Sequence, residues 1–99
     1  MHIISSSTLR SFFAKYADSK YSLIAWLKIA KTANWHNFVE VRQSFPSADL
    51  VGNLTVFNIG GNKYRLITYI NYKTKKIFIR EFLTHSEYDK NNWKSDPWF

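Results

Sequence analysis

The residues best suited to chemistry lie in one continuous stretch, from Gly61 to Lys90. These thirty residues hold seven Lys and Arg against three acidic residues, a net charge of +4. The stretch ends in a cluster of polar side chains, several of which can transfer protons: Thr84, His85, Ser86, Glu87 and Tyr88. Cations beside proton-transfer groups predict a surface that binds a phosphodiester and acts on it.

Cleavage of RNA without a metal needs a base for the 2′-hydroxyl, cations for the phosphate and an acid for the departing oxygen. Arg65 suits the phosphate because a guanidinium binds two oxygens at once and keeps its proton, and Lys63 adds a point charge. His85 is the acid–base candidate, since an ordinary imidazole titrates at about pH 6.5. Tyr88 could stack on a base, bond to the phosphate or assist proton transfer.

Four further cations are expected to contact RNA. They are Lys73, Lys75 and Lys76 in a predicted turn, and Arg80 in the strand that follows. Each prediction has a structural alternative. Lys63 and Arg65 could be ordinary cations of a sheet surface, and Arg80 could pair with Glu81 or with another carboxylate. His85 could be an exposed loop residue, and Tyr88 a half-buried aromatic that closes the core.

Periodicity predicts the helices that must support this stretch. Ile3 and Ile4 suit a short strand, and Ser5 to Ser7 can cap a helix whose apolar stripe is Leu9, Phe12, Phe13 and Tyr16. Asp18 or Ser19 can cap a second helix, antiparallel to the first, with Leu23, Trp26, Leu27 and Ala30 on one face. A third segment, with Asn34 as a possible cap, carries Phe38, Val41 and Phe45 and stops at Pro46.

Three strands are predicted after a loop over residues 47–53. They span residues 54–59, 63–72 and 77–84, so the fold class is α+β, in the order β-α-α-(α)-β-β-β. A turn centred on Thr74 and Lys75 would place Arg65 opposite Thr84, and Ile67 opposite Phe82. Lys63, Arg65, Ile67 and Tyr69 would then share a face with Arg80, Phe82 and Thr84, and a slip of one residue would invert this assignment. The opposite, helix-facing side would hold Tyr64, Leu66, Ile70, Tyr72, Ile77, Ile79 and Leu83.

Composition bounds the organisation and the kinds of site. The 99 residues fit a single domain, 1–99, with an irregular tail at 91–99. There is no cysteine and no HExxH, Walker A, GxSxG or zinc-ligand pattern, so neither a metal nor a cofactor is expected. No signal peptide or membrane span is visible, which predicts a cytoplasmic protein. The net charge of +7 favours a polyanion or an acidic protein partner, although it also fits a solvated surface rich in lysine.

The chain resembles the HigB-type toxins of bacterial type II toxin–antitoxin modules, within the RelE/ParE-like group. The resemblance covers nearly the whole chain and departs only beyond Lys90. The segments that carry it are Leu23-Ile24-Ala25-Trp26, Asn34-Trp35, Phe45-Pro46-Ser47-Ala48-Asp49, Val51-Gly52-Asn53, Val56-Phe57-Asn58-Ile59, Gly61-Asn62-Lys63-Tyr64-Arg65-Leu66, Ile70-Asn71-Tyr72 and Thr84-His85-Ser86-Glu87-Tyr88-Asp89. Their joint order and spacing make the signal strong.

This resemblance implies a RelE-like fold, in which an antiparallel sheet packs on helices and a concave face receives mRNA. It implies a metal-independent endoribonuclease that inhibits translation, often by cutting mRNA on the ribosome. A HigA-type helix-turn-helix antitoxin would silence it, and operator DNA would be contacted only through that antitoxin. By position, Arg65 and Lys63 look like the phosphate-binding cations and His85 and Tyr88 like the terminal His–Tyr pair, with Arg80 a weaker match.

Two alternatives belong to other classes. A ParE-like toxin would bind gyrase on the same scaffold, although such a protein has no need of the acid–base group His85. A non-catalytic RNA- or ribosome-binding module would also fit basic charge and exposed aromatics. Trp35, Trp93 and Trp98 are expected at the surface, where they would supply apolar contacts to the antitoxin.

Overall fold

A five-stranded mixed sheet forms the centre of the computed structural model, which describes residues 1–99. The spatial order is β1-β5-β4-β3-β2, with bounds β1 His2–Ile4, β2 Asp49–Val51, β3 Leu54–Ile59, β4 Tyr64–Asn71 and β5 Lys76–Thr84. Strands β2 to β5 pair antiparallel, whereas β1 pairs parallel with β5. The predicted α+β class is confirmed, with one parallel strand added to the antiparallel sheet expected.

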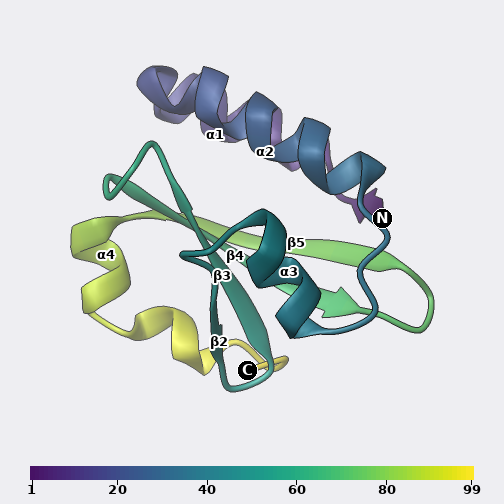
Figure 1. Cartoon of the computed structure of the whole chain (residues 1–99). Coiled ribbons are helices and arrows are strands. Elements are labelled where there is room, and N and C mark those ends of the chain that lie inside the picture. The colour runs from purple at the N-terminus through teal and green to yellow at the C-terminus, as the bar shows by residue number, and fades with distance from the viewer.

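Three helices cover one side of this sheet. Helices α1 (Thr8–Lys15) and α2 (Lys20–Thr32) are joined by the 3-10 turn η1 (Ala17–Ser19), and α3 spans Phe38–Ser44. Figure 1 shows α1 and α2 lying together over the sheet, away from the yellow C-terminal segment. The cap of α3 is Asn37, whose side chain accepts from the Glu40 N–H, so the prediction of Asn34 was wrong. None of the helices has the length and apolar character needed to cross a membrane.

The larger of two cores lies between these helices and the sheet. Leu9, Leu23, Trp26 and Ala30, from the predicted apolar stripes, are buried there. The indole of Trp26 packs edge-on to the ring of Phe57 at 5.3 Å between centroids. Strand residues that alternate along β4 and β5 complete this core: Tyr64, Leu66, Ile70, Ile77, Ile79 and Phe82.

A second core lies on the other face of the sheet, under the C-terminal segment. It consists of Leu54, Val56, Ile67 and Trp93, and Tyr88 and Phe99 pack against it. The tail was predicted to be irregular, but it forms the 3-10 helix η2 (Asn92–Ser95) and seals this face. Trp93 is only 3% exposed, and Trp35 only 4%, so the prediction that both lie at the surface was wrong. Trp98, by contrast, remains 38% exposed.

The end of the chain is docked against the turn between β2 and β3. Gly52 has φ +60°, and a Cβ there would lie 2.5 Å from the carbonyl oxygen of Phe99. That same oxygen accepts a hydrogen bond of 2.7 Å from the backbone N–H of Asn53. Only glycine permits both the left-handed turn and the close approach, which fixes the path of the tail.

The register of the β4–β5 hairpin differs from the prediction. Asn71 pairs with Lys76 across a four-residue turn in which the Thr74 N–H donates to Asn71 Oδ1, and Lys75 has φ 59°. A bulge then shifts the pairing, so Arg65 lies opposite Leu83 and Ile67 opposite Glu81. Arg80 is the extra residue of that bulge. Phe82 and Thr84 therefore belong to the helix-covered face, and Leu83 to the other face, contrary to the predicted assignment.

Two elements were missed by the sequence reasoning. Strand β2 lies inside the predicted loop 47–53, and a short helix, α4 (His85–Asp89), follows β5 directly. A capping box starts α4, because Thr84 Oγ1 accepts from the Glu87 N–H and Glu87 Oε1 accepts from the Thr84 N–H. The hydroxyl of Tyr16 donates to the same Glu87 oxygen at 3.0 Å. These bonds tie α4 to the helix layer, and the hydrogen bond from the Thr84 backbone lowers the pKa of Glu87.

Replacing Glu87 should therefore destabilise the fold in a way that depends on its acceptor atoms. Glu87→Ala removes the Glu87 half of the capping box and the acceptor for Tyr16, at a cost of about 1 kcal/mol, which corresponds to roughly 4–8 °C in Tm for a domain of this size. Glu87→Gln keeps an acceptor for Thr84 and Tyr16 and should lose less. Thermal unfolding followed by circular dichroism measures both variants.

The pH dependence of the same measurement checks the charge. Because the pKa of Glu87 is depressed in the folded state, its ionised form stabilises the protein above its ordinary value of 4.5. That contribution is lost as the pH falls through the lower, folded-state pKa. The Tm difference between wild type and Glu87→Gln should therefore shrink on acidification, and a constant difference would contradict the assigned role of the charge.

Candidate active site

Arg65 is a nearly buried cation without a carboxylate partner. Its side chain projects from β4 on the face opposite α1 and α2, and the residue is 8% exposed. Nη1 donates to the carbonyl oxygens of Asn62 and Tyr64 at 3.2 and 3.1 Å, and Nη2 donates to Asn62 Oδ1 at 2.8 Å. Nε makes no hydrogen bond within the protein. Neutral acceptors thus orient the guanidinium but leave its charge uncompensated, which is the arrangement expected of an anion-binding group.

The ring of Tyr88 lies beside this guanidinium, with 5.5 Å between the Arg65 Cζ and the ring centroid. Tyr88 also stacks on Trp93, with the ring centroids 5.0 Å apart and the ring planes inclined by 13°. The indole Nε1 of Trp93 donates to the Tyr88 carbonyl. Burial raises the pKa of the Tyr88 phenol, and the nearby Asp49 raises it further. The phenol is therefore protonated at neutral pH and can donate a proton or a hydrogen bond, but it is poorly suited to act as a base.

His85 begins α4 and is open to solvent. Its backbone N–H donates to the Lys63 carbonyl at 2.9 Å, so the start of α4 is fixed to the turn before β4. Its Nδ1 lies 3.0 Å from Asp89 Oδ2, one helical turn further on. A carboxylate in that position favours the tautomer with the proton on Nδ1 and leaves Nε2 free to accept one. His85 and Tyr88 are three residues apart and so lie on adjacent positions of the helix surface.

Lys63 reaches the other way, toward the helix layer. Its ammonium lies 3.2 Å from Asp18 in η1, and both side chains are more than half exposed. The Tyr64 hydroxyl also donates to Asp18, an interaction that raises the pKa of Tyr64 to about 12. Lys63 is thus at the edge of the site and already paired with an exposed carboxylate, which is a weak interaction that an incoming phosphate can replace.

The structure separates the other predicted cations from this group. Arg80 donates from Nε and Nη2 to the two oxygens of Asp96 at 2.9 and 3.0 Å. Its carboxylate partner is therefore Asp96 and not Glu81. Lys75 donates to the Trp35 carbonyl at 2.8 Å. Lys73 and Lys76 are exposed at the hairpin turn, at the opposite end of β4 from Arg65. The structure places Arg65 beside Tyr88 and His85 at the start of the same helix, whereas Lys63 lies at the edge of this group with its ammonium turned to Asp18.

Three residues near the site escaped the sequence reasoning. Asn62 orients Arg65, and Asp89 faces His85. The contact of Asp89 could have been predicted from the His-x-x-x-Asp spacing, which places the two side chains one helical turn apart. Glu81 lines a small hollow of about 210 Å³ together with Leu83, Glu87, Lys90, Asn92 and Trp93. Burial raises the pKa of Glu81, and Asp96 adds to the effect. Its position depends on the shifted register, so no local pattern pointed to it.

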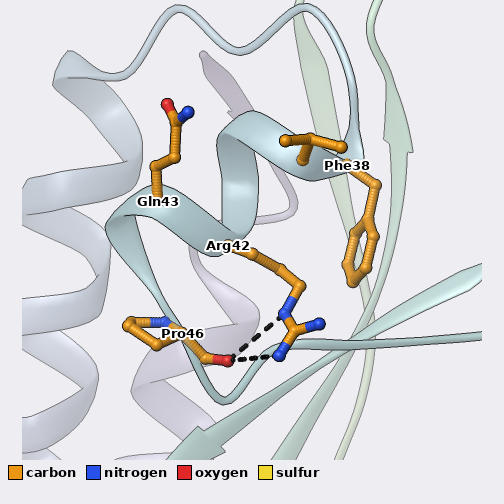
Figure 2. Close-up of a pocket in the computed structure, with 5 residues that line it drawn as sticks. Phe38, Arg42, Gln43 and Pro46 are labelled. Carbon is orange, nitrogen blue, oxygen red and sulfur yellow. Dashed lines mark hydrogen bonds between the residues drawn. The ribbon is translucent and has the colours of Figure 1, made fainter.

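A separate cleft lies on α3. It measures about 410 Å³ and is lined by Phe38, Val39, Arg42, Gln43 and Pro46. Figure 2 shows Arg42 turned back on its own helix end, where it donates to the Pro46 carbonyl at 3.3 and 3.0 Å. The cleft contains no group that could transfer a proton, and its one cation is held by backbone. The groups predicted from the sequence to transfer protons and bind phosphate lie elsewhere, at the α4 end of the sheet.

Comparison with known proteins identifies the family of the chain. Residues 19–91 match the family described as the RelE-like toxic component of a toxin–antitoxin system, HigB toxin. The chain is 32% identical over 93 residues to the mRNA interferase HigB of Escherichia coli O6:H1, covering 91% of this chain and 90% of the relative. It is 33% identical over 92 residues to the mRNA interferase HigB of Shigella flexneri, covering 90% and 88% respectively. The chain therefore belongs to the HigB toxin family, the RelE-like toxic components of toxin–antitoxin systems.

Proposed function

We propose that the protein is an mRNA interferase, an endoribonuclease that cuts mRNA on translating ribosomes and thereby inhibits translation. The names of its relatives support the activity. The observation that carries the proposal is Arg65, a buried guanidinium held by neutral oxygens with no carboxylate to balance it. A phosphodiester would supply the missing negative charge. Substrate and ribosomes both lie in the bacterial cytoplasm, where the protein would act.

In the proposed reaction the RNA supplies its own nucleophile. His85 Nε2 accepts the proton of a 2′-hydroxyl, and the oxygen attacks the adjacent phosphorus. The P–O5′ bond then breaks, and the 5′-oxygen leaves with a proton from a nearby donor, for which the Tyr88 phenol is the candidate. Arg65 binds the phosphate oxygens as their charge grows, and Lys63 adds a second cation once it exchanges Asp18 for the phosphate. The products are a 2′,3′-cyclic phosphate and a free 5′-hydroxyl, and no step needs a metal ion.

The exposed cations of the hairpin turn suit a second task. Lys73 and Lys76 lie away from the proposed reaction centre, so they would contact phosphates of mRNA or of ribosomal RNA rather than the scissile group. Lys75 and Arg80 are held by the protein itself and would contribute little to such contacts.

A gyrase-binding toxin on the same scaffold would require neither Arg65 nor His85.

Membership in a toxin family implies a cognate antitoxin, and we propose one of the HigA helix-turn-helix type that contacts operator DNA. Its contact surface on the toxin is proposed to be the groove between α1 and α2. That groove, of about 290 Å³, is lined by Ser6, Ser7, Leu9, Arg10, Phe13, Ile24, Leu27 and Lys31. Residues 8–32 carry five cations against the single carboxylate of Asp18. An acidic amphipathic helix would complement both the apolar floor and the positive rim.

Loss of the guanidinium should abolish toxicity without harming the fold. Arg65→Met keeps an apolar stem and removes an uncompensated buried charge, so the unfolding midpoint should be unchanged or raised. Losing a contact made to the developing charge should lower cleavage by about 10²–10³-fold. Growth inhibition and thermal unfolding measure the two effects, with Lys28→Met as the control, since Lys28 is an exposed cation of α2 outside both the site and the groove. An Arg65→Met protein that stays folded and toxic would remove Arg65 from the site.

His85→Gln should separate chemistry from binding. Because a proton-transfer group acts in the chemical step, cleavage should fall by about 10²–10⁴-fold while RNA affinity changes little. The assay uses isolated protein with a model RNA, since chelators also disrupt ribosomes. Cleavage by the wild type should survive EDTA there, and an absolute requirement for added divalent metal would contradict the mechanism.

Antitoxin binding should be steered by charge and held by apolar contacts. The association rate should fall as salt rises, because the toxin carries a net charge of +7. Ile24→Ala should raise the dissociation rate, because Ile24 lines the groove. Ile29→Ala is the matched control, since Ile29 is on the same helix, similarly exposed and outside the groove. Equal dissociation rates for the two variants would exclude the groove as the contact surface.

A further inference from the structure

A hollow with aromatic walls lies where the C-terminal segment crosses β4 and β5. It measures about 480 Å³ and is lined by Asn53, Tyr69, Asn71, Phe78, Pro97 and Trp98, the set called here the aromatic pocket. The Trp98 centroid is 5.3 Å from that of Tyr69 and 5.2 Å from that of Phe78, with the rings inclined by 71° and 84°. Three planar side chains thus meet at steep angles and offer flat surfaces to a planar ligand.

The polar groups of the aromatic pocket are free for such a ligand. Asn71 Oδ1 accepts from the Thr74 N–H, which leaves the Asn71 amide protons unused. The side chain of Asn53, the hydroxyl of Tyr69 and the Nε1 of Trp98 make no hydrogen bond within the protein. Flat aromatic surfaces surrounded by unused amide and hydroxyl groups match the two ways in which proteins hold an unstacked base, by stacking and by bonding to its edge.

The charge near the aromatic pocket favours the same kind of ligand. The Arg80 guanidinium covers one face of Trp98, with its Cζ 4.1 Å from the indole centroid, and Asp96 holds it there. Lys76 is exposed and pairs with Asn71 across the hairpin, and Lys73 is exposed in the adjacent turn. No carboxylate lines the pocket. A nucleotide in this position would have its base in the pocket and its phosphates near these lysines.

The aromatic pocket also lies in line with the proposed reaction centre. Arg65, Ile67 and Tyr69 alternate along β4, so they share the face opposite α1 and α2. At about 3.3 Å per residue, Tyr69 lies roughly 13 Å along the strand from Arg65. The sheet between them is covered, because Ile67 is buried under the C-terminal segment, so a short single-stranded segment bound at Arg65 would reach the pocket across the outer surface of that segment.

We infer that the aromatic pocket binds one unstacked nucleobase of the RNA substrate and so helps to set the position of the cut. This inference rests on the proposed RNA cleavage. Pro97 and Trp98 lie beyond residues 19–91, the part of the chain that matches the family model, so two residues of the pocket come from the C-terminal segment outside that match. The same segment that closes the second core thereby completes a binding site.

Binding of fluorescein-labelled 2′-O-methyl RNA oligonucleotides, followed by anisotropy, tests the inference, because they cannot be cleaved by 2′-hydroxyl attack. Trp98→Ala should weaken binding by about 5- to 150-fold, the range for loss of one base–aromatic stack. Trp98→Leu keeps an apolar side chain against Tyr69 and Phe78 but has no aromatic ring on which a base can stack. It should therefore weaken binding as well. Tyr21→Ala is the control, since Tyr21 is an aromatic that is 81% exposed on α2.

Abasic substitutions locate the base. A series of oligonucleotides, each lacking the base at one position, should reveal one position whose loss weakens binding to the wild type but not to Trp98→Leu. Failure of the wild type to bind, or an equal loss in both proteins at every position, would overturn the subsite. Unchanged RNA binding with weaker antitoxin binding in Trp98→Leu would assign the pocket to the antitoxin instead. Growth inhibition with mRNA cleavage in cells, measured in parallel, tests the proposed function independently of these outcomes.

Discussion

The structure around the candidate site depends on holding one guanidinium, that of Arg65, almost fully buried without a counterion. Removing a cation from water is costly unless hydrogen bonds and nearby charges compensate it. Arg65 obtains only three bonds, all to neutral oxygens of Asn62 and Tyr64. The folded chain therefore bears a cost at this position that a bound phosphate would relieve. Such an arrangement is more informative about function than an exposed basic patch, because surface lysines and arginines have no comparable cost to explain.

Holding Arg65 in this state requires elements from distant parts of the chain. The β3–β4 turn supplies Asn62, and α4 supplies the ring of Tyr88. Helix α4 is itself fixed by the capping box of Thr84 and Glu87, which Tyr16 joins from the helix layer. Trp93 then stacks on Tyr88 from the C-terminal segment. The second core is thus a support for the site, since its aromatic residues fix the face of α4 that borders Arg65.

The parts of the fold that follow from local pattern were predictable, and those that depend on distant partners were not. The helix stripes and strands could be identified because periodicity is local. The hairpin register was wrong because the bulge at Arg80 is stabilised by Asp96 and Trp98, sixteen and eighteen residues later. Trp93 looked like a surface residue because nothing nearby in sequence indicates the second core. Helix α4 was a missed signal, since Thr84 and Glu87 already have capping-box spacing.

The same distinction applies to the candidate site. Lys63, Arg65, His85 and Tyr88 could be grouped from sequence because the start of one hairpin strand always lies beside the end of the next, whatever the register. The partners that separate Arg80 and Lys75 from that group could not be identified from sequence, because they are a carboxylate of the tail and a carbonyl before α3.

The division of proton-transfer roles follows from the unequal exposure of two neighbours on α4. Tyr88 is packed between Arg65 and Trp93, and burial raises the pKa of its phenol, so it keeps its proton. His85 is open to solvent, with Asp89 at Nδ1. If both groups act on one phosphodiester, the histidine is the one suited to take a proton and the tyrosine the one suited to give one. Glu81 lies near the same end of the sheet, and burial raises its pKa too. Trp93 lines the hollow that contains Glu81 and stacks on Tyr88, so the C-terminal segment contributes to the burial of both groups.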